Sequence, residues 1–209
     1  PLIDEPDVNL IAWTTTPWTL PSNLALCVNP EFEYVKIKDK TRDDQIFIIL
    51  EKRLGQIFPE VRKPDCSDET KASLYEILDR FKGTSLIGKK YKPIFPYFEQ
   101  LDTAFRVCGD AYVTEEGGTG IVHQAPAFGE DDYRVCVAHK IIGKGEGIPC
   151  PLDDNGRFTS EVPEFQGQNV KDADAGICKM LKASGRLVLK ETYDHSYPFC
   201  WRSDTPLIY

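Results

Sequence analysis

Short β-prone runs recur along most of this chain, and their spacing constrains the fold more than any other feature of the sequence. Turn-forming residues such as Pro21-Ser22-Asn23 and Asn29-Pro30 separate neighbouring runs. Strands that follow one another every eight to twelve residues or so are typical of barrels and sandwiches. The expected strands cover residues 10–13, 25–28, 34–37, 45–50, 105–108, 112–113, 121–123 and 187–190.

Three other segments show the apolar spacing of helices. In the first, apolar residues at positions 74, 77, 78 and 81 lie on one helical face, and Gly83 supplies a C-terminal stop. The second has its apolar face at positions 173, 177, 180 and 181 and stops at Gly185, and the third begins near Gly129. We therefore predict one α+β domain over residues 1–209, with a β-barrel-rich core and peripheral helices.

Residues 143–169 depart from this regular pattern. Glycine and proline are frequent there, at positions 143, 145, 147, 149, 151, 156, 163 and 167. That density predicts a long irregular excursion from the body of the domain. Within it, Glu161-Val162 and Phe165 offer side chains that could dock back onto the body.

The charge balance is acidic: 25 basic and 33 acidic side chains give the 209 residues a net charge of −8. A domain that binds nucleic acid by itself usually has a basic excess, because neutralisation of phosphates supplies most of the non-specific affinity. If this chain meets a nucleic acid, other parts of a larger assembly must therefore supply most of the binding.

Other features of the sequence indicate part of a longer cytoplasmic protein. No apolar run approaches the roughly 20 residues that a membrane-spanning helix needs. The chain opens at Pro1, contains one methionine and stops in an apolar run at Tyr209, so we expect it to be a piece of a longer protein. Even the closest two of its seven cysteines, Cys136 and Cys150, lack the short spacing of a zinc knuckle or redox motif, which predicts reduced, buried thiols.

The first chemistry-bearing motif is the sequence WTTTPWTLPSN at residues 13–23. Three consecutive threonines after a strand present hydroxyls and backbone amides together, and two prolines stiffen the turn. Such a loop can hold a polar ligand or position a water molecule. The same threonines would also suit an ordinary β-edge, and the residues alone do not separate the two interpretations.

The second motif is GGTGIVHQAPAFGEDD at residues 117–132. Its glycines allow the backbone to approach a ligand closely, and a strand delivers His123 to its end. The helix that follows begins with Glu130, Asp131 and Asp132, and the positive helix end favours their ionised form. An ionised carboxylate in a pocket wall would suit an ammonium ligand. The alternatives are that these acids only compensate the helix dipole, which we favour for Glu130, and that His123 is a core side chain.

Several other chemistries lack a residue that they require. A metal site at His123, Asp131 and Asp132 lacks a further ligand in this stretch, so we expect neither a metal ion nor another cofactor. The glycines at 117–120 are followed by neither the lysine nor the third glycine of a phosphate-binding loop. Neither motif contains a cysteine, and a serine-hydrolase elbow is absent.

Taken together, the two motifs resemble the editing domain of class I aminoacyl-tRNA synthetases, in its isoleucyl form. The resemblance covers essentially the whole chain, from Trp13 to the closing stretch at residues 197–207, which resembles the family's return path to the synthetic core. Leucyl and valyl relatives usually have Thr-Thr-Arg-Pro at the threonine loop, whereas this chain has the isoleucyl form Thr-Thr-Thr-Pro. Phe128 stands where many bacterial members have a histidine, as in the eukaryotic cytosolic type.

The resemblance also implies roles for individual residues. Asp132 would pair with the α-ammonium of a misattached valine, and the threonines would hydrogen-bond the terminal adenosine and aminoacyl group and help to place the hydrolytic water. Trp18 and Asn23 would line the adenosine side, and His123 would wall the side-chain pocket. The implied catalytic residues are Thr15, Thr16, His123 and Asp132. The implied substrate contacts are Thr14, Thr15, Thr16, Trp18, Asn23, His123, Ala125, Gly129, Asp131 and Asp132.

The activity that the resemblance implies is hydrolysis of valyl-tRNA(Ile) in the cytoplasm. One methylene distinguishes isoleucine from valine, and this pair is itself the familiar example of the limit of about 1–3 kcal/mol that an apolar pocket can discriminate. The implied partners are the valine-carrying 3′-terminal adenosine of tRNA(Ile) and the rest of the synthetase chain, without a membrane. The alternatives are a module that holds the acceptor end without hydrolysis, a purely structural insert, and the editing domain of a valyl or leucyl relative.

Overall fold

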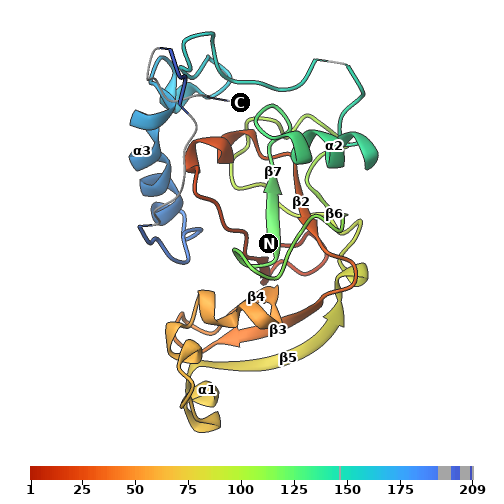
Figure 1. The fold of residues 1–209 in the computed structure, drawn as a ribbon, viewed down its shortest axis with the longest axis vertical. Coiled ribbons are helices and arrows are strands. Elements are labelled where there is room, and N and C mark those ends of the chain that lie inside the picture. The colour runs from red at the N-terminus through yellow and green to blue at the C-terminus, as the bar shows by residue number, and fades with distance from the viewer. Residues whose placement is uncertain (146, 193–198, 203–207, 209) are drawn as a thin grey trace.

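The computed structural model describes residues 1–145, 147–192, 199–202 and 208, and it contains two separate β-sheets. Figure 1 shows the larger sheet in the lower half of the molecule and the smaller one, beside helix α2, in the upper half. The larger sheet has the order β1 (Val8–Leu10), β4 (Gln45–Leu50), β3 (Glu33–Asp39), β5 (Tyr75–Lys82). The smaller sheet has the order β6 (Arg106–Gly109), β2 (Ala25–Val28), β7 (Ile121–Gln124).

The larger sheet is buried on both faces along its central strand β4, because that strand is apolar at successive positions. Strand β4 pairs with β1 in parallel and with β3 antiparallel, with Tyr34 opposite Leu50. Tyr34 and Leu50 belong to the main hydrophobic cluster, whereas their neighbours Val35 and Ile49 pack into a second cluster with Phe58. Near-continuous apolar runs are what a strand covered on both faces requires.

The smaller sheet positions the residues of the second motif. Its central strand β2 is completely buried and pairs with β6 in parallel and with β7 antiparallel. The register places Cys27 opposite Cys108, and helix α2 (Glu130–Ala138) adds the buried Cys136 to the same cluster. Strand β7 occupies an outer position in this sheet and therefore leaves one edge beside the threonine loop.

Helix α3 (Val170–Ala183) packs against the 3₁₀ helix η1 (Pro17–Ser22) in a third hydrophobic cluster. Trp18 of η1 and Ile177 of α3 are buried in this cluster. The irregular excursion contributes the buried Val162 and Phe165, the latter in the short 3₁₀ helix η5 (Pro163–Phe165), whereas Glu161 is exposed. Docking through Val162 and Phe165 is therefore confirmed, and Figure 1 shows α3 at one side of the molecule.

The helix predicted over residues 74–81 is wrong. A helix, α1, does occur at Asp68–Leu74, with Ser67 as the N-cap that accepts a hydrogen bond from Thr70, but the chain then becomes strand β5. Tyr75, Ile77 and Phe81 also fit a two-residue alternation, and in β5 they pair with Asp39, Ile37 and Tyr34 of β3. The sequence of this segment is compatible with both a helix and a strand, and pairing with β3 selects the strand.

The predicted barrel is not found, because the described strands form two open sheets and no closed one. The expected strands at residues 112–113 and 187–190 are irregular, and the first strand ends at Leu10 instead of continuing to residue 13. The strands predicted at 25–28 and 45–50 have the predicted bounds. The α+β class is confirmed, with the helices α1, α2 and α3 and three further 3₁₀ segments, η2 (Glu51–Gln56), η3 (Pro59–Arg62) and η4 (Gly83–Ser85).

Cys27, Cys66, Cys108, Cys136, Cys150 and Cys178 have free thiols, although Cys66 and Cys150 are not buried. Burial raises the pKa of the Cys27 and Cys136 thiols and raises that of Cys108 to about 11, so these three are poor nucleophiles at neutral pH. Cys150, in contrast, is exposed. Of the helices in the described part of the chain, none combines the length and apolarity needed to cross a bilayer. The closing stretch at residues 197–207 falls mostly outside the described residues.

Two neighbouring glycines provide a matched test of this fold. Gly120 has a φ of +76°, and a Cβ atom there would lie 2.4 Å from the Leu50 Cβ, whereas a Cβ on Gly117 would meet nothing within 4 Å. Gly120→Ala combines left-handed strain with overpacking, so we expect it to lower the free energy of unfolding by about 2–4 kcal/mol. Gly117→Ala should change it by less than about 0.5 kcal/mol. Urea unfolding of both variants checks this, and equal losses would contradict the packing at Gly120.

Candidate active site

A cavity of about 390 Å³ lies between the threonine loop and the outer edge of strand β7. Both sequence motifs reach it, so residues more than 100 positions apart share one site. It is lined by six of the residues singled out in the sequence: Thr14, Thr15, Thr16, His123, Ala125 and Asp132. Its other walls include Trp13, Thr19, Tyr112, Thr119 and Phe128, together with the glycine loop at residues 117–120.

The threonine loop is held by a row of hydrogen bonds between its own residues. The Thr14 hydroxyl accepts from the Thr16 backbone N–H at 3.0 Å and lies 3.3 Å from the Thr16 hydroxyl. The Thr19 hydroxyl donates to the Thr16 carbonyl at 2.9 Å, and the Thr16 and Thr19 hydroxyls are 3.4 Å apart. Pro17 then fixes the backbone at the first position of η1. The hydroxyls therefore have defined positions before any ligand arrives.

His123 extends this row into the core. Its Nε2 lies 3.0 Å from the Thr19 hydroxyl oxygen. Because that hydroxyl already donates its one hydrogen to the Thr16 carbonyl, Nε2 carries the proton and donates to it. Nδ1 is then the nitrogen with the free lone pair, and it has no hydrogen-bond partner among the described residues. The imidazole is 7% exposed.

Burial lowers the pKa of His123 to about 4. The imidazole is therefore neutral at physiological pH, which agrees with its single hydrogen bond to a hydroxyl. A base with so low a pKa removes protons weakly at neutral pH, since the most effective general bases have pKa values near the working pH. The geometry thus favours His123 as a wall of the cavity that also fixes the position of Thr19.

Asp132 points its carboxylate back across the first turn of α2 toward the end of β7. Its Oδ2 accepts a hydrogen bond from the Ala125 backbone N–H at 2.8 Å. Gly129 makes room for this arrangement, because a Cβ there would lie 3.0 Å from the Asp132 Cγ and 3.2 Å from both carboxylate oxygens. Gly129 does not line the cavity, and its contribution is to leave room for the Asp132 carboxylate.

Burial raises the pKa of Asp132 to about 6, and the hydrogen bond from Ala125 opposes this shift without cancelling it. The sequence had suggested that the helix end would keep this carboxylate ionised, and the direction of the shift is the opposite. At pH 7 the carboxylate is still mostly ionised. A half-buried anion held in this way gains most from a cationic ligand, which would replace the water that it has lost.

The other two acids of the α2 first turn face away from the cavity. Asp131 is exposed and pairs with Arg134 at 3.0 Å, and Arg134 also holds Asp110 at 2.7 Å. The Arg134 guanidinium lies 5.7 Å from the centre of the Tyr112 ring, which lines the cavity. Glu130 is exposed as well, as expected of a residue that only compensates the helix dipole.

Trp18 and Asn23, expected on the adenosine side, do not line this cavity. Asn23 is buried and fully engaged, since it donates to the Ala25 carbonyl at 2.9 Å and accepts from the Tyr91 hydroxyl at 2.6 Å. Trp18 is buried against α3, and its ring meets Phe128 edge-on at 5.0 Å between centroids. Trp18 therefore supports the Phe128 wall from behind, whereas Asn23 lines the larger cavity described below.

Tyr112 and Phe128 are aromatic wall residues that sequence patterns indicate only weakly. Tyr112 belonged to a predicted strand, and Phe128 was noted only as a departure from a pattern. Tyr112 accepts a hydrogen bond from Gln124 Nε2 at 2.6 Å, which fixes its ring beside β7. An aromatic residue in an irregular segment between two motifs is too common for the sequence alone to place it in a site.

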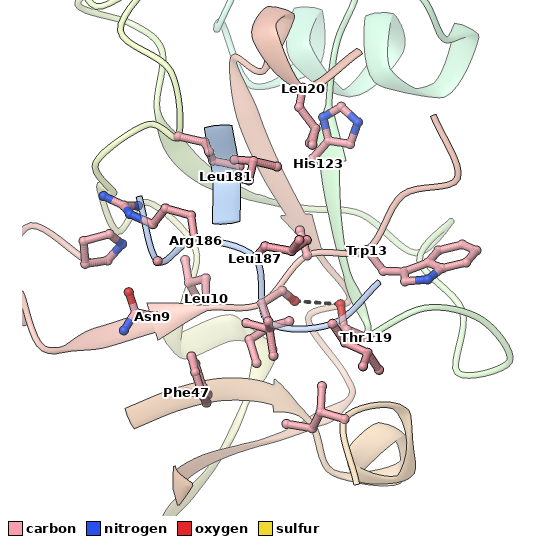
Figure 2. A pocket seen from close by; sticks show the side chains of 18 of the residues that line it. Asn9, Leu10, Trp13, Leu20, Phe47, Thr119, His123, Leu181, Arg186 and Leu187 are labelled. Atoms are coloured by element: carbon pink, nitrogen blue, oxygen red, sulfur yellow. Dashed lines mark hydrogen bonds between the residues drawn. The ribbon is translucent and has the colours of Figure 1, made fainter. Parts of the chain in front are cut away.

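A second, larger cavity of about 770 Å³ lies on the other side of the threonine loop. Figure 2 shows apolar side chains from several elements around it, among them Leu10, Leu20, Phe47, Leu181 and Leu187. His123, Trp13 and Thr119 line both cavities, and the Thr119 hydroxyl donates to the Ile11 carbonyl at 2.6 Å. Within the described residues, no three His, Cys, Asp or Glu side chains gather closely enough to hold a metal ion.

The raised pKa of Asp132 predicts that this residue destabilises the unliganded protein at neutral pH. The folded state binds its proton more tightly than the unfolded state, so the stability present below pH 4 is lost as pH rises through about 6. We expect Asp132→Asn to raise the free energy of unfolding at pH 7 by about 1–3 kcal/mol and to flatten its pH dependence between pH 4 and 6. Urea unfolding across this range measures both, and a less stable Asn variant at pH 7 would contradict the assignment.

The sequence is similar to one segment of cytoplasmic isoleucine-tRNA ligases. It is 56% identical to that of Mus musculus over 211 residues, which is 100% of this chain and 16% of the mouse protein. It is 53% identical to that of Saccharomyces cerevisiae and 50% identical to that of Arabidopsis thaliana, over 100% and 99% of this chain and 19% of each relative. The chain therefore spans less than a fifth of the length of these relatives. No family model matches it.

The fold is similar to that of solved editing domains. The P. knowlesi cytosolic leucyl-tRNA synthetase editing domain aligns with a TM-score of 0.61 and 13% identity, over 86% of this chain and 82% of that one. The crystal structure of GlLeuRS-CP1 aligns with a TM-score of 0.62 and 16% identity, over 90% and 85%. The chain is therefore homologous to one segment of the isoleucine-tRNA ligases, and its fold is that of the class I aminoacyl-tRNA synthetase editing domains.

Proposed function

We propose that this chain is the editing domain of a cytoplasmic isoleucine-tRNA ligase and that it hydrolyses the ester bond of valyl-tRNA(Ile). The observation that carries the proposal is the 390 Å³ cavity, in which the half-buried Asp132 carboxylate and the row of threonine hydroxyls line one space. An aminoacyl ester has an ammonium group that suits the carboxylate and polar oxygens that suit the threonine hydroxyls. The names of the relatives support the choice of isoleucine-tRNA ligase.

Asp132 binds the α-ammonium of the misattached valine in this proposal. Its carboxylate is fixed by the Ala125 N–H, so the ion pair forms without ordering a flexible side chain. The ammonium compensates a half-buried negative charge, and a charge-assisted contact of this kind is worth about 1.5–3 kcal/mol. Asp131 is already paired with Arg134 outside the cavity, so it contributes little to binding.

Thr14, Thr15 and Thr16 bind the terminal adenosine and aminoacyl group and orient the attacking water. The hydroxyls of Thr14 and Thr16 are held in fixed positions, and preorganised donors stabilise the charge that develops on the ester carbonyl during attack. None of these side chains is a strong base. We propose that the free ribose hydroxyl of the tRNA assists in accepting the proton from the water, which is held in position by the threonines.

His123 sets the size of the pocket for the amino acid side chain. The imidazole is buried, neutral and fixed by Thr19, so it presents a rigid surface to the cavity. Valine fits against such a wall, whereas the additional methylene of isoleucine is excluded by size, which supplies the discrimination that a single binding step cannot reach. Trp13 and Phe128, which also line the cavity, offer aromatic surface for the adenine ring.

The partners in this proposal are the valine-carrying acceptor end of tRNA(Ile) and the remainder of the synthetase chain. With a net charge of −8, the domain is unsuited to holding the body of a tRNA alone. The competing functions are a module that holds the acceptor end without hydrolysis and the editing domain of a valyl or leucyl relative. Release of valine from valyl-tRNA(Ile) distinguishes the proposal from the first, and its substrate preference distinguishes it from the second.

The proposal is tested with the full-length protein on valyl- and isoleucyl-tRNA(Ile), scoring the release of each amino acid. We expect rapid release of valine and little release of isoleucine. Asp132→Ala should lower kcat/KM for valyl-tRNA(Ile) by roughly ten- to a hundredfold or more, because it removes the anchor of the ammonium group. Asp131→Ala is the matched control, and it should change kcat/KM less than about threefold. A wild-type protein that leaves valyl-tRNA(Ile) intact, or equal and small effects of the two variants, would refute the proposal.

His123→Ala tests the wall directly. Removal of the imidazole enlarges the pocket, so the variant should keep much of its activity on valyl-tRNA(Ile) and begin to hydrolyse isoleucyl-tRNA(Ile). If His123 were a general base, the substitution would instead lower the rate of hydrolysis of both substrates by about 10²–10⁴-fold. If His123 only filled the core, the substitution would lower the stability of the protein and leave its selectivity between the two substrates unchanged. The ratio of valyl-tRNA(Ile) to isoleucyl-tRNA(Ile) hydrolysis distinguishes these three roles. An unchanged ratio would exclude the role of His123 as a steric wall.

A further inference from the structure

The 3₁₀ helix η1 carries part of the hydroxyl row, and its N-terminus lacks a local cap. Thr16, at the N-cap position, makes no side-chain capping hydrogen bond, and Pro17 has no N–H to donate. The first free donor of η1 is therefore the backbone N–H of Trp18. It donates to Oδ1 of Asp174 at 2.8 Å. Asp174 lies in helix α3, so a residue 156 positions later in the sequence caps this turn.

Asp174 places a carboxylate at a mostly apolar border, where it accepts the Trp18 N–H and lies near the positive charges of Lys171 and Lys190. It sits beside Ala173 at the border of the apolar face with which α3 packs against η1, and it is only partly accessible. Burial raises the pKa of its carboxyl, while the hydrogen bond from Trp18 acts in the opposite direction. An apolar side chain would be less costly at the edge of such a cluster. The hydrogen bond from the Trp18 N–H offsets part of the cost of burying this carboxylate.

Two walls of the cavity follow from the position of η1. On one side, Thr16 and Thr19 bracket its first turn and lead to His123 through the hydrogen bond between Thr19 and Nε2. On the other side, the Trp18 ring supports Phe128 edge-on, with ring planes inclined at 69°. The capped N–H belongs to Trp18 itself, so displacement of this one residue shifts both the hydroxyl row and the aromatic wall.

We propose that Asp174 is a positioning residue for the deacylation reaction: by capping η1 from helix α3, it holds the threonine hydroxyls and the Phe128 wall in their working geometry. This inference rests on the proposed function. Asp174 lines neither cavity and touches no substrate, so it acts through η1 alone. Misplacement of catalytic groups by about 1 Å lowers reaction rates strongly, up to roughly a hundredfold.

The test uses the full-length protein and four substitutions in α3. Asp174→Ala removes the acceptor, Asp174→Asn keeps an oxygen at the same position without the charge, and Asp174→Glu keeps the charge but moves it. Asp172→Ala is the control, since Asp172 is an exposed acid two residues earlier in the same helix. We expect Asp174→Ala to lower kcat for valyl-tRNA(Ile) about tenfold or more with KM within about twofold, because only the attacking geometry changes.

The pattern across the variants separates positioning from plain stability. Asp174→Asn should recover most of kcat, Asp174→Glu should fall between Asn and Ala, and Asp172→Ala should match the wild type. Isoleucylation of tRNA(Ile) by the same preparations should be unchanged, which shows that the protein remains folded. If Asp174→Ala is too unstable to assay, the kcat values of Asp174→Glu and Asp174→Asn are compared instead. The positioning role requires Asp174→Asn to be the more active of the two, because it keeps the acceptor oxygen in place.

Each contrary outcome has one meaning. An unchanged kcat in Asp174→Ala, or a Glu variant as active as Asn or more active, overturns the role of Asp174 and leaves the proposed function standing. A kcat that falls only in proportion to the loss of isoleucylation also overturns it, because that result indicates general unfolding. A wild-type protein that does not hydrolyse valyl-tRNA(Ile) overturns the proposed function, and the role of Asp174 falls with it.

Discussion

The buried hydrogen bond between His123 and Thr19 is the contact on which the candidate site depends. It joins strand β7 to the 3₁₀ helix η1, two elements that are 104 residues apart at this point. Since Thr19 also donates to Thr16, the bond fixes the tautomer of the imidazole and the direction of the hydroxyl row together. The cavity between the two elements therefore has one defined shape, which size discrimination requires.

Asp132 adds a second constraint of a different kind. Its carboxylate is partly desolvated and accepts one backbone N–H, so the site keeps an incompletely satisfied anion in its wall. Functional sites commonly contain groups that lower the stability of the free protein because the ligand supplies what they lack. In the proposed function the ligand supplies a cation, the ammonium group of the substrate. The neighbouring Asp131 would not compete for that cation, because it already pairs with Arg134 outside the cavity.

Sequence patterns predicted the local elements of this fold well and its assembly poorly. Strands β2 and β4 have the predicted bounds, α2 begins directly after Gly129, and α3 ends two residues before Gly185. Residues 75–82 were predicted wrongly because Ile77 and Phe81 fit both a helical face with Leu74 and a two-residue alternation with Tyr75, and only pairing with β3 selects the strand. Closure into a barrel depends on how sheets meet, about which local spacing contains no information.

The same division applies to the site. Thr14, Thr16, His123 and Asp132 were identified because they stand in two compact motifs, and the cavity brings them together. Trp18 and Asn23 belong to the same motif but turn inward, where Asn23 bonds Tyr91 and Trp18 packs on α3. Asp174 lies in a helix that the sequence explains by packing alone. A motif names residues that are near in sequence, whereas orientation and remote support are set by tertiary contacts.

The hydrogen bond between Trp18 and Asp174 also has a consequence for the order in which the molecule matures. Most of its site is encoded between residues 13 and 132, yet the cap of η1 lies 156 residues beyond Trp18. During synthesis from the N-terminus, the threonine loop leaves the ribosome long before helix α3 exists. Contacts of such sequence separation form late, after their loop-closure entropy has been overcome. The hydroxyl row thus acquires its final geometry only when nearly the whole domain has been made.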